Sequence, residues 1–367
     1  QLRCKPSWAN APFTILLQFQ RLCSPTRKSL GPDSPRSFTP GAYEQIETGV
    51  NLDLNYAIPV SGWASDLGVA AGFEWRDEQF DITAGDPASY ALGPLADQGF
   101  SSSSNGFGGF SESSSNSESN IGIYGELEAD ITDYFTLQTA VRYSDYDTFG
   151  DGVTWKVGGL YKLTDNLTLR STYSTGFHAP TSGQANVKNV TTQINNGLLL
   201  DQGTLPLTSN PGQLAADFLQ FQSGVRPDLG TETADNLSLG VAFSTGPVSW
   251  TVDYFNIRVK DRIATSDRIT FLDALDYLAD AANEADTDIT TLDGALVAGY
   301  DGSTVSSAIT TLAAANALVR SDYTGFEDLT TFQFFTNSFD TKTTGFDIIA
   351  NMPFDIGSGS SSVTLAA

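Results

Sequence analysis

From residue 43 onward, apolar and polar residues alternate along the chain with a period of two. In the stretch GVNLDLNYAI, Val50, Leu52 and Leu54 lie on one face, and Asn51 and Asp53 lie on the other. The same alternation recurs in further segments, at Leu67–Trp75, Ile121–Ile131, Leu137–Tyr143, Trp155–Leu163, Leu167–Tyr173, Leu237–Phe243, Val248–Tyr254 and Phe346–Met352. Successive side chains of a β-strand point to opposite faces, so each segment is predicted to be an amphipathic strand.

The connections between these strands are either very short or very long. Short polar turns are predicted at 130–134, 162–166 and 244–247, where Asp, Asn, Gly and Thr supply turn geometry. Long polar inserts are predicted at about 82–119, 177–233 and 262–336. This alternation is typical of a transmembrane β-barrel, which has short periplasmic turns and long outer loops. The alternative is a soluble β-sandwich or solenoid, but sandwich strands are usually only about 5–6 residues long.

Two further patterns add to this prediction. Aromatic residues gather near the strand ends, which suits an interfacial girdle; they are Tyr124, Tyr134, Phe135, Tyr143, Tyr173, Phe177, Tyr254 and Phe255. The third insert departs from period two, because Phe271, Leu272, Leu275 and Leu278 recur at helical spacing and SSAITTLAAANALV is also helix-like. We expect short helices inside an outer loop, which form either a small packed core or, less simply, a ligand-responsive lid.

Composition excludes some function classes. The sequence has no apolar run long enough for a membrane-spanning helix. With 43 acidic and 19 basic residues the net charge is −24, so nucleic-acid binding is not expected.

Residues 1–40 differ in charge from the rest of the chain. They hold six basic residues, one aspartate and both cysteines, Cys4 and Cys23. We expect this stretch to be an unassigned basic leader outside the fold, such as the product of a mis-set start, rather than a cleavable signal peptide. A Cys4–Cys23 disulfide has no support beyond the count of two cysteines.

The line LRSTYSTGFHAPTSGQ, from Leu169 to Gln184, resembles the barrel domain of TonB-dependent outer-membrane receptors. In that family a strand with arginine, serines, glycine, phenylalanine, arginine, alanine and proline leads into a long extracellular loop. Other segments resemble the same family in the same order, at 85–100, 140–151, 232–243, 252–263 and 334–350. The resemblance covers about residues 43–367.

The resemblance implies a barrel of 22 antiparallel strands with an N-terminal plug inside it. Such a receptor lies in the outer membrane of a Gram-negative bacterium and binds a scarce solute: a siderophore, cobalamin, a metal complex or an oligosaccharide. It imports the solute with force transmitted by the TonB protein, which acts through the plug.

This chain departs from the family pattern. His178 stands where arginine is usual, no plug precedes residue 43, and the chain ends at SSSVTLAA. We therefore expect an all-β fold in which residues 41–367 form a partial barrel of about 9–12 strands. A partial barrel has two open edges whose unpaired backbone groups are costly in lipid, so this polypeptide alone is predicted neither to insert stably nor to transport.

The residues that could carry chemistry point to no catalytic, cofactor or metal site. His178 is the only histidine, and we interpret it as a loop-start residue rather than a zinc ligand or catalytic base. The stretch 284–294 has spaced acids but lacks the glycine and glutamate of an EF-hand, so it is interpreted as a solvated acidic loop rather than a calcium site. GFGGF at 106–110 does not open a helix and is interpreted as loop glycine.

Three arginines on the polar faces, Arg76, Arg142 and Arg170, either balance lumenal charge or contact a plug or a passing solute. The function predicted is thus a receptor and transporter barrel whose partners are outer-membrane lipid, TonB through a plug, and a small-molecule substrate. The alternative is a secreted or surface β-rich binding or structural protein. An outer-membrane hydrolase fares worst, because one histidine would have to serve as its base and no serine motif frames it.

Overall fold

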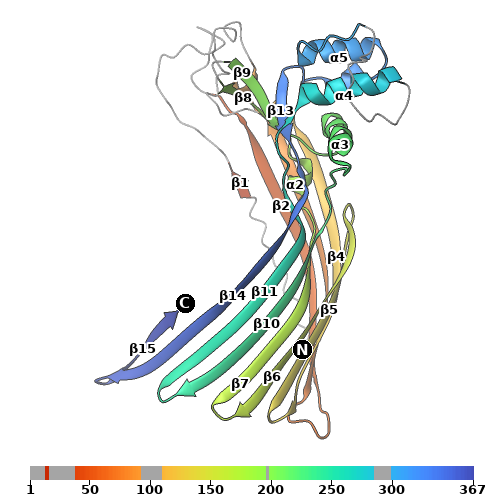
Figure 1. The fold of residues 1–367 in the computed structure, drawn as a ribbon. Helices are drawn as coiled ribbons and strands as arrows, with labels where there is room; N and C mark the ends of the chain where they lie inside the picture. Colours follow the sequence, from red (N-terminus) through yellow and green to blue (C-terminus); the bar gives the residue numbers. More distant parts are fainter. Residues whose placement is uncertain (1–12, 16–37, 92–109, 196–197, 285–298) are drawn as a thin grey trace.

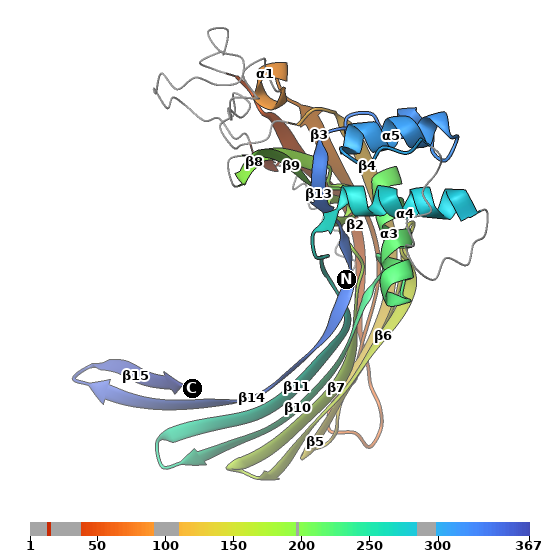
Figure 2. The same cartoon turned by 45° about the horizontal axis from the view of Figure 1, so that its top comes forward.

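The structure is a computed structural model that describes residues 13–15, 38–91, 110–195, 198–284 and 299–367 (Figure 1). Its main feature is one curved antiparallel sheet of eleven strands in the order β1-β2-β3-β4-β5-β6-β7-β10-β11-β14-β15. Figures 1 and 2 show this sheet as a single concave wall that is open between its two edge strands. The predicted antiparallel barrel wall with 9–12 strands is therefore confirmed.

Apart from the three-residue β1, the strands of the wall are long, and they lie in sequence order. Their bounds are β1 (Phe13–Ile15), β2 (Gly41–Ile58), β3 (Leu67–Ala84), β4 (Ser114–Thr132), β5 (Phe135–Tyr146), β6 (Gly150–Thr164), β7 (Leu167–His178), β10 (Glu232–Thr245), β11 (Val248–Thr265), β14 (Phe335–Ile356) and β15 (Gly359–Ala366). Short turns join neighbours at one end, which we call the inner end, and the long inserts lie at the other, the outer end. The loop at 147–149 is an exception, because it is short although it lies at the outer end.

The first predicted insert is shorter in the structure than in the prediction. Residues 114–119, read as polar loop, form the start of β4 and pair with β3 as far as Ile82↔Ser114. Ladder hydrogen bonds hold a strand whatever its side chains are. A strand that continues above the apolar zone therefore has no apolar pattern by which it could be recognised.

Only two short pieces of the predicted 1–40 leader are described. Phe13–Ile15 pairs with Tyr43–Gln45 at the edge of the wall, and residues 38–40 lead into β2. Cys4 and Cys23 lie outside the described residues. The division of the chain at residue 40 stays a prediction.

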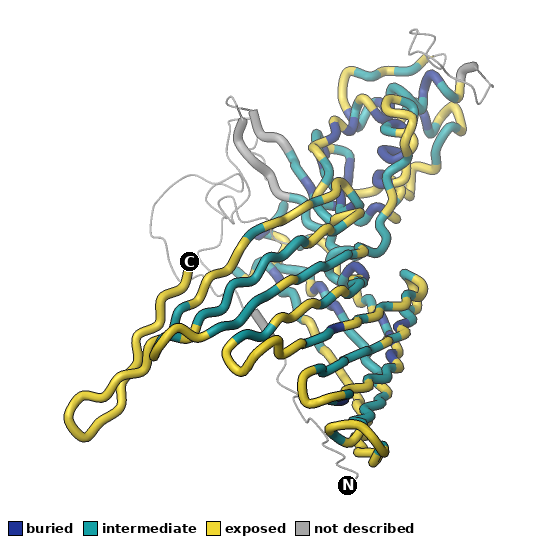
Figure 3. Tube along the Cα trace, turned by 60° about the horizontal axis from the view of Figure 1, so that its bottom comes forward, coloured by how far each residue is buried: buried dark blue, intermediate teal, exposed yellow. Residues whose placement is uncertain are grey.

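The apolar rows of the wall have no second protein layer against them. Their larger members are exposed; they include Val50, Leu52, Leu54, Tyr56, Ile123, Leu127, Val141, Trp155, Val157, Tyr161, Leu169, Leu239, Phe346 and Ile348. Figure 3 shows the inner-end half of the wall as exposed or intermediate, with few buried positions. A β-sandwich would bury one face of each sheet, so this arrangement is that of a barrel wall. Ala129 is an exception: it is 4% exposed, and the neighbouring turn residue Ser65 is bonded to Asp130.

A compact body, which we call the outer cap, sits on the outer end of the wall beside β10, β11 and β14 (Figures 1 and 2). The segment after β7 contributes β8 (Asn189–Asn195), β9 (Leu198–Thr204) and α3 (Asn210–Ser223). The segment between β11 and β14 contributes β12 (Ile269–Thr270), α4 (Phe271–Glu284), α5 (Val305–Ala314), η3 (Arg320–Tyr323) and β13 (Leu329–Gln333). A small sheet of order β12-β13-β9-β8 joins the two segments, and its β13–β9 pair is parallel.

Local sequence signals explain where the cap helices begin and end. Ser209 accepts a hydrogen bond from the Gly212 amide at the start of α3, and Gly224 ends that helix with φ 77°. Thr304 opens α5 with a capping box, and the helix stops before Asn316, whose φ is 59°. Both helices predicted from the third insert are thus present, although α5 is shorter than the apolar run suggested.

The cap holds the main hydrophobic core of the described residues. Its buried side chains come from both segments and include Leu205, Leu214, Phe218, Phe271, Leu275, Ile309, Leu312, Leu329, Phe332 and Phe334. This confirms the prediction of a small packed core in an outer loop. None of the helices in the described part of the chain is long and apolar enough to cross a bilayer. Two short helices, α1 (Pro87–Tyr90) and α2 (Ser182–Asn186), complete the outer end.

Candidate functional site

The concave face of the wall is polar and carries paired charges. Arg142 Nη2 lies 2.8 Å from Glu74 Oε2, between β5 and β3. Arg170 Nε donates to Asp253 Oδ1 at 2.8 Å, from β7 to β11 across the intervening β10. Arg76 and Glu47 are more loosely paired, at 3.9 Å. Each arginine predicted to face the lumen therefore has an acidic partner one or two strands away, which agrees with the interpretation that these arginines balance lumenal charge.

Glycines make room on this face for large polar side chains. The ring of Tyr124 lies over Gly72, where any Cβ would overlap it, and its hydroxyl donates to Asp53. At Gly240 a Cβ would come within 2.6 Å of Arg170 Nε. A glycine inside a strand often marks such a close approach. The glycines of the wall are thus part of the site and not simply weak strand formers.

The predicted aromatic girdle is therefore only partly right. Tyr134, Tyr143 and Tyr173 are exposed large side chains, as a girdle requires. Tyr124 instead bonds to Asp53, and Phe255 lies over Gly345 at 2.6 Å from the position of an added Cβ. Both side chains therefore lie on the concave face, opposite to their apolar neighbours. The prediction was wrong for them because it considered only how near each aromatic is to a strand end, not which face it occupies.

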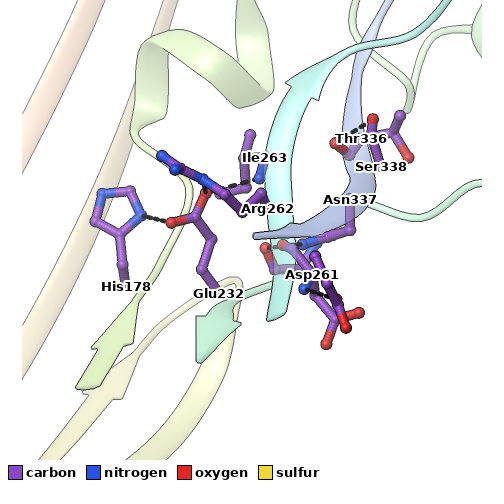
Figure 4. A network of polar contacts seen from close by, with 10 residues as sticks. His178, Glu232, Asp261, Arg262, Ile263, Thr336, Asn337 and Ser338 are labelled. Carbon is purple, nitrogen blue, oxygen red and sulfur yellow. Dashed lines mark hydrogen bonds and ion pairs between the residues drawn. The ribbon is translucent and has the colours of Figure 1, made fainter. Parts of the chain in front are cut away.

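Above the ion pairs, a cluster of polar groups lines the outer rim of the concave face (Figure 4). His178 is the last residue of β7, and its Nδ1 lies 3.8 Å from Glu232 Oε2 at the start of β10. Arg262 Nε reaches the other oxygen of Glu232 at 4.0 Å, and the Ile263 amide donates to that oxygen at 2.7 Å. The Glu232 side chain is 15% exposed, whereas those of His178 and Arg262 are 57% and 46% exposed. The rim thus presents two basic side chains to solvent around one partly buried carboxylate.

Next to this cluster, β11 is bulged and one asparagine bridges the bulge (Figure 4). Asp261 has φ 55°, and the register of β11 against β14 shifts between Val259 and Arg262. Asn337 Nδ2 donates to Asp261 O at 2.5 Å and to Gly230 O at 3.2 Å. Its Oδ1 accepts from the Gly230 amide at 2.5 Å. Bulges re-aim side chains at the rims of barrels, and here the bulge turns Arg262 toward Glu232.

The predicted position of His178 at a loop start agrees with the structure, but its neighbours were not foreseen. Glu232 and Arg262 lie far from it in sequence, and only strand register brings them together. Within the described residues no group of three or more His, Cys, Asp or Glu side chains could hold a metal ion. The acidic stretch after Glu284 and most of GFGGF lie outside the described residues.

Two tyrosines of the outer cap have displaced acid–base behaviour. Burial raises the pKa of Tyr323 to about 12. Burial, together with a hydrogen bond to Asp276, raises the pKa of Tyr300 far above its ordinary value. Both phenols stay neutral at physiological pH and act as packing groups of the cap.

Comparison with protein-family models gives one match, to the family described as TonB dependent receptor-like, beta-barrel, over residues 13–365. A comparison with curated proteins gives no match.

Among solved structures, two variants of the ferric enterobactin receptor PfeA of Pseudomonas aeruginosa in complex with enterobactin are similar to this chain. Each has a TM-score of 0.50, at 15% and 16% identity, and covers 89% of this chain and 36% of the receptor. The siderophore receptor PirA of Pseudomonas aeruginosa has a TM-score of 0.49 at 13% identity, and covers 89% of this chain and 43% of that receptor. The chain thus spans well under half the length of these structures, and the likeness shows the fold.

Proposed function

The chain belongs to the family of TonB-dependent receptor-like β-barrels, and on that premise we propose that it forms part of the wall of an outer-membrane barrel that imports a scarce solute. The family is one of outer-membrane receptors and transporters, so transport rather than catalysis is the proposed activity.

One observation carries this proposal: the two faces of a single wall have opposite chemistry. On β2, Leu52 and Leu54 are exposed on the convex face, while Glu47 and Asp53 engage Arg76 and Tyr124 on the concave face. Apolar side chains with no protein partner suit bilayer hydrocarbon, and paired charges suit a filled polar interior. A soluble β-protein would leave the apolar rows in water, which is unfavourable for a patch of this extent.

The sheet is open at both edges, which affects whether it could stand in a membrane alone. Its edge strands, β1 and β15, each have one side without a neighbour in the described sheet. Unpaired backbone groups are costly in hydrocarbon, and closed barrels avoid them. We therefore propose that further strands complete the barrel, and that a plug inside it carries the contact with TonB. The strands described would then not insert or transport on their own.

The substrate class follows from the proposed function only in outline. A ferric siderophore is the first class to test, since the ferric enterobactin receptor shares the fold. Cobalamin, other metal complexes and oligosaccharides are the other classes that the family resemblance suggests. The rim formed by His178, Glu232 and Arg262 is the entry through which any of them would pass.

Fractionation of cells that make the whole receptor tests the membrane assignment. We expect the protein in the outer-membrane fraction, released by detergent but not by high salt. Recovery at high yield in the aqueous fraction would instead support the alternative of a secreted or surface β-rich binding protein.

Uptake tests the transport assignment. Cells carrying the whole receptor should accumulate radiolabelled iron from a ferric siderophore, and cells without TonB should not. Equal uptake in both strains would exclude TonB-dependent import of that compound, and the other solute classes would then be tried in the same way.

A further inference from the structure

Basic side chains are unevenly divided between the two faces of the wall. Those of the concave face are spread over five strands and lie among acids; they are Arg76, Arg142, Lys156, Lys162, Arg170 and Arg262. On the convex face of the described strands there are three, Arg258 and Lys260 on β11 and Lys342 on β14. Strand parity places them there, since Arg258 and Lys260 share the face of Tyr254, and Lys342 shares that of Phe346.

These three cations form one cluster on adjacent strands. Arg258 and Lys342 are directly opposite each other in the ladder, and Lys260 is the next residue on the same face of β11. All three are exposed, and none forms an ion pair with a described residue. Like charges placed opposite each other in a sheet are destabilising unless an anion compensates them.

Two acids on this face offset part of that charge. Asp235 lies opposite Arg258 on β10 and also accepts a hydrogen bond from the Tyr173 hydroxyl at 2.9 Å. Asp340 shares the face of Lys342 and accepts from the Asp261 amide at 3.1 Å. The three cations outnumber these two acids, so a net positive charge is left. The rest of the convex rim differs in sign, because the corresponding positions of β3, β5 and β6 carry Asp77, Asp145 and Asp151. An anion would therefore be held at β11 and β14 and repelled elsewhere.

The height of the cluster on the wall matches the boundary of the hydrocarbon. On β11 and β14, Tyr254 and Phe346 form the outermost aromatic pair of the apolar rows, with ring centroids 5.2 Å apart. The next convex positions are Asn256 and Thr344, and the cations follow. Four residues of a tilted strand rise about 10 Å along the membrane normal. The cations thus lie just outside the apolar zone, where lipid phosphates are found.

Directly below the cluster, the apolar rows contain a groove. It has a volume of about 600 Å³ and opens on the convex face. Gly159 and Ser171 leave it open, and its walls include Tyr161, Leu239, Tyr254 and Phe346. Two of these wall residues, Tyr254 and Phe346, lie on the same strands as the cations. A groove of this lining fits a hydrocarbon chain.

We propose that the convex face of β11 and β14 binds one phospholipid with net negative charge, with its headgroup on Arg258, Lys260 and Lys342 and an acyl chain in the groove beside Tyr254 and Phe346. The inference rests on the proposed function, because it requires this face to stand in a bilayer. Arginine binds phosphate oxygens through two parallel donors, and lysine adds a mobile point charge. Clusters of basic residues at a membrane surface are a recognised signal for anionic lipids.

Native mass spectrometry of the whole receptor, extracted from the membrane with detergent, tests the site. The probes are phosphatidylglycerol and a phosphatidylcholine with the same acyl chains. We expect one phosphatidylglycerol to be retained, and the variant Arg258→Gln, Lys260→Gln, Lys342→Gln to retain about tenfold less. A matched control, Lys156→Gln, Lys162→Gln, Arg320→Gln, removes three cations elsewhere and should retain as much as the unmodified chain.

The groove is tested separately from the charges. Gly159→Leu fills it, and the new Cβ meets the Phe135 ring at an ordinary 3.4 Å. This variant should retain less phosphatidylglycerol with all three cations in place. Glycerol phosphate, which has the headgroup but no chain, should not displace the lipid.

Three results would overturn the proposal: equal retention by the cation variant and its control, equal retention of the two lipids, or full displacement by glycerol phosphate. Cell fractionation separates this failure from that of the proposed function. A protein found in the outer membrane with no lipid preference refutes the lipid site alone, whereas a protein found in the aqueous fraction refutes both.

Discussion

The wall exposes its apolar side chains, whereas the outer cap buries them. Leu52 on β2 is 45% exposed, whereas Leu275 on α4 is fully buried, although both are leucines in regular secondary structure. The wall places its apolar rows on the surface that the proposed bilayer covers, and the cap buries its apolar residues against one another. The period of the apolar pattern differs in the same way, since it is two in the wall, where the apolar rows are exposed, and helical in the cap, where they are buried.

The largest effect is expected from removing a core side chain of the cap. Leu275→Ala leaves a cavity in a fully buried site and should destabilise the cap by about 2–5 kcal/mol. Hydrogen exchange of the α4 and β13 amides would measure the loss. The matched control is Leu54→Ala on the convex face of β2, where no protein packs and the exchange of the cap should not change.

Because the two cap segments share one core, the effect of Leu275→Ala should also reach α3. Faster exchange confined to α4 would contradict this, and would mean that the two segments fold independently despite their common core.

The next largest effect comes from placing a charge on the wall. Leu52→Arg puts a cation in the apolar zone and should cost about 2–4 kcal/mol of folding free energy in a bilayer. Asn51→Arg places the same charge one residue away on the concave face and should cost much less. Folding of the whole receptor with each substitution in lipid vesicles, followed by the heat-sensitive migration of the folded barrel, measures both. Equal free-energy costs for the two substitutions would contradict this prediction, because they would mean that the two faces of β2 have the same surroundings.

A smaller effect tests the concave face. Gly240→Ala brings a methyl group into Asp253 and within 2.6 Å of Arg170 Nε, so the ion pair must move and about 1–3 kcal/mol of stability should be lost. Gly158→Ala is the control, because its Cβ meets Thr172 Oγ1 at 3.3 Å and needs only a small shift. Asp253→Ala removes the overlapped carboxylate, so Gly240→Ala combined with Asp253→Ala should cost less than the sum of the two single changes if the overlap is the cause of the loss.

The sequence predicted the wall well because the period-two pattern records which side chains face outward. It also predicted α4, since Phe271, Leu275 and Leu278 repeat at helical spacing. Residues 114–119 were misassigned because they lie above the apolar zone, where both faces of a strand meet water and the alternation disappears.

The candidate site could not be predicted from the sequence, because its residues are brought together by strand register. His178, Glu232 and Arg262 meet through the register of β7, β10 and β11, and a bulge at Asp261 reverses the parity before Arg262. Register depends on long-range pairing, which one sequence does not contain. Arg258 and Lys260 could have been assigned to the convex face from the sequence, because they are separated from Tyr254 by an even number of positions. The position of Lys342 beside them follows only from the pairing of β11 with β14.

The smallest expected effect is a loss of cap stability at alkaline pH that the wall does not share. The pKa of Tyr323 is about 12 in the folded cap and near its ordinary value of 10.0 in an unfolded chain, with burial as the main cause. A raised pKa means that the contribution of the neutral phenol is complete below pH 10 and is lost as the pH rises toward 12. At pH 11 the loss should be on the order of 1 kcal/mol for this residue. Tyr323→Phe keeps the ring near Phe271 and removes the ionisation, so the variant cap should lose less stability between pH 9 and pH 11. Hydrogen exchange, corrected for its intrinsic pH dependence, measures this loss.

The wall supplies the internal reference, because amides of β3 and β4 lie outside the cap and should respond equally in both proteins. An identical alkaline loss in the cap of the variant would show that Tyr323 is not the group that titrates.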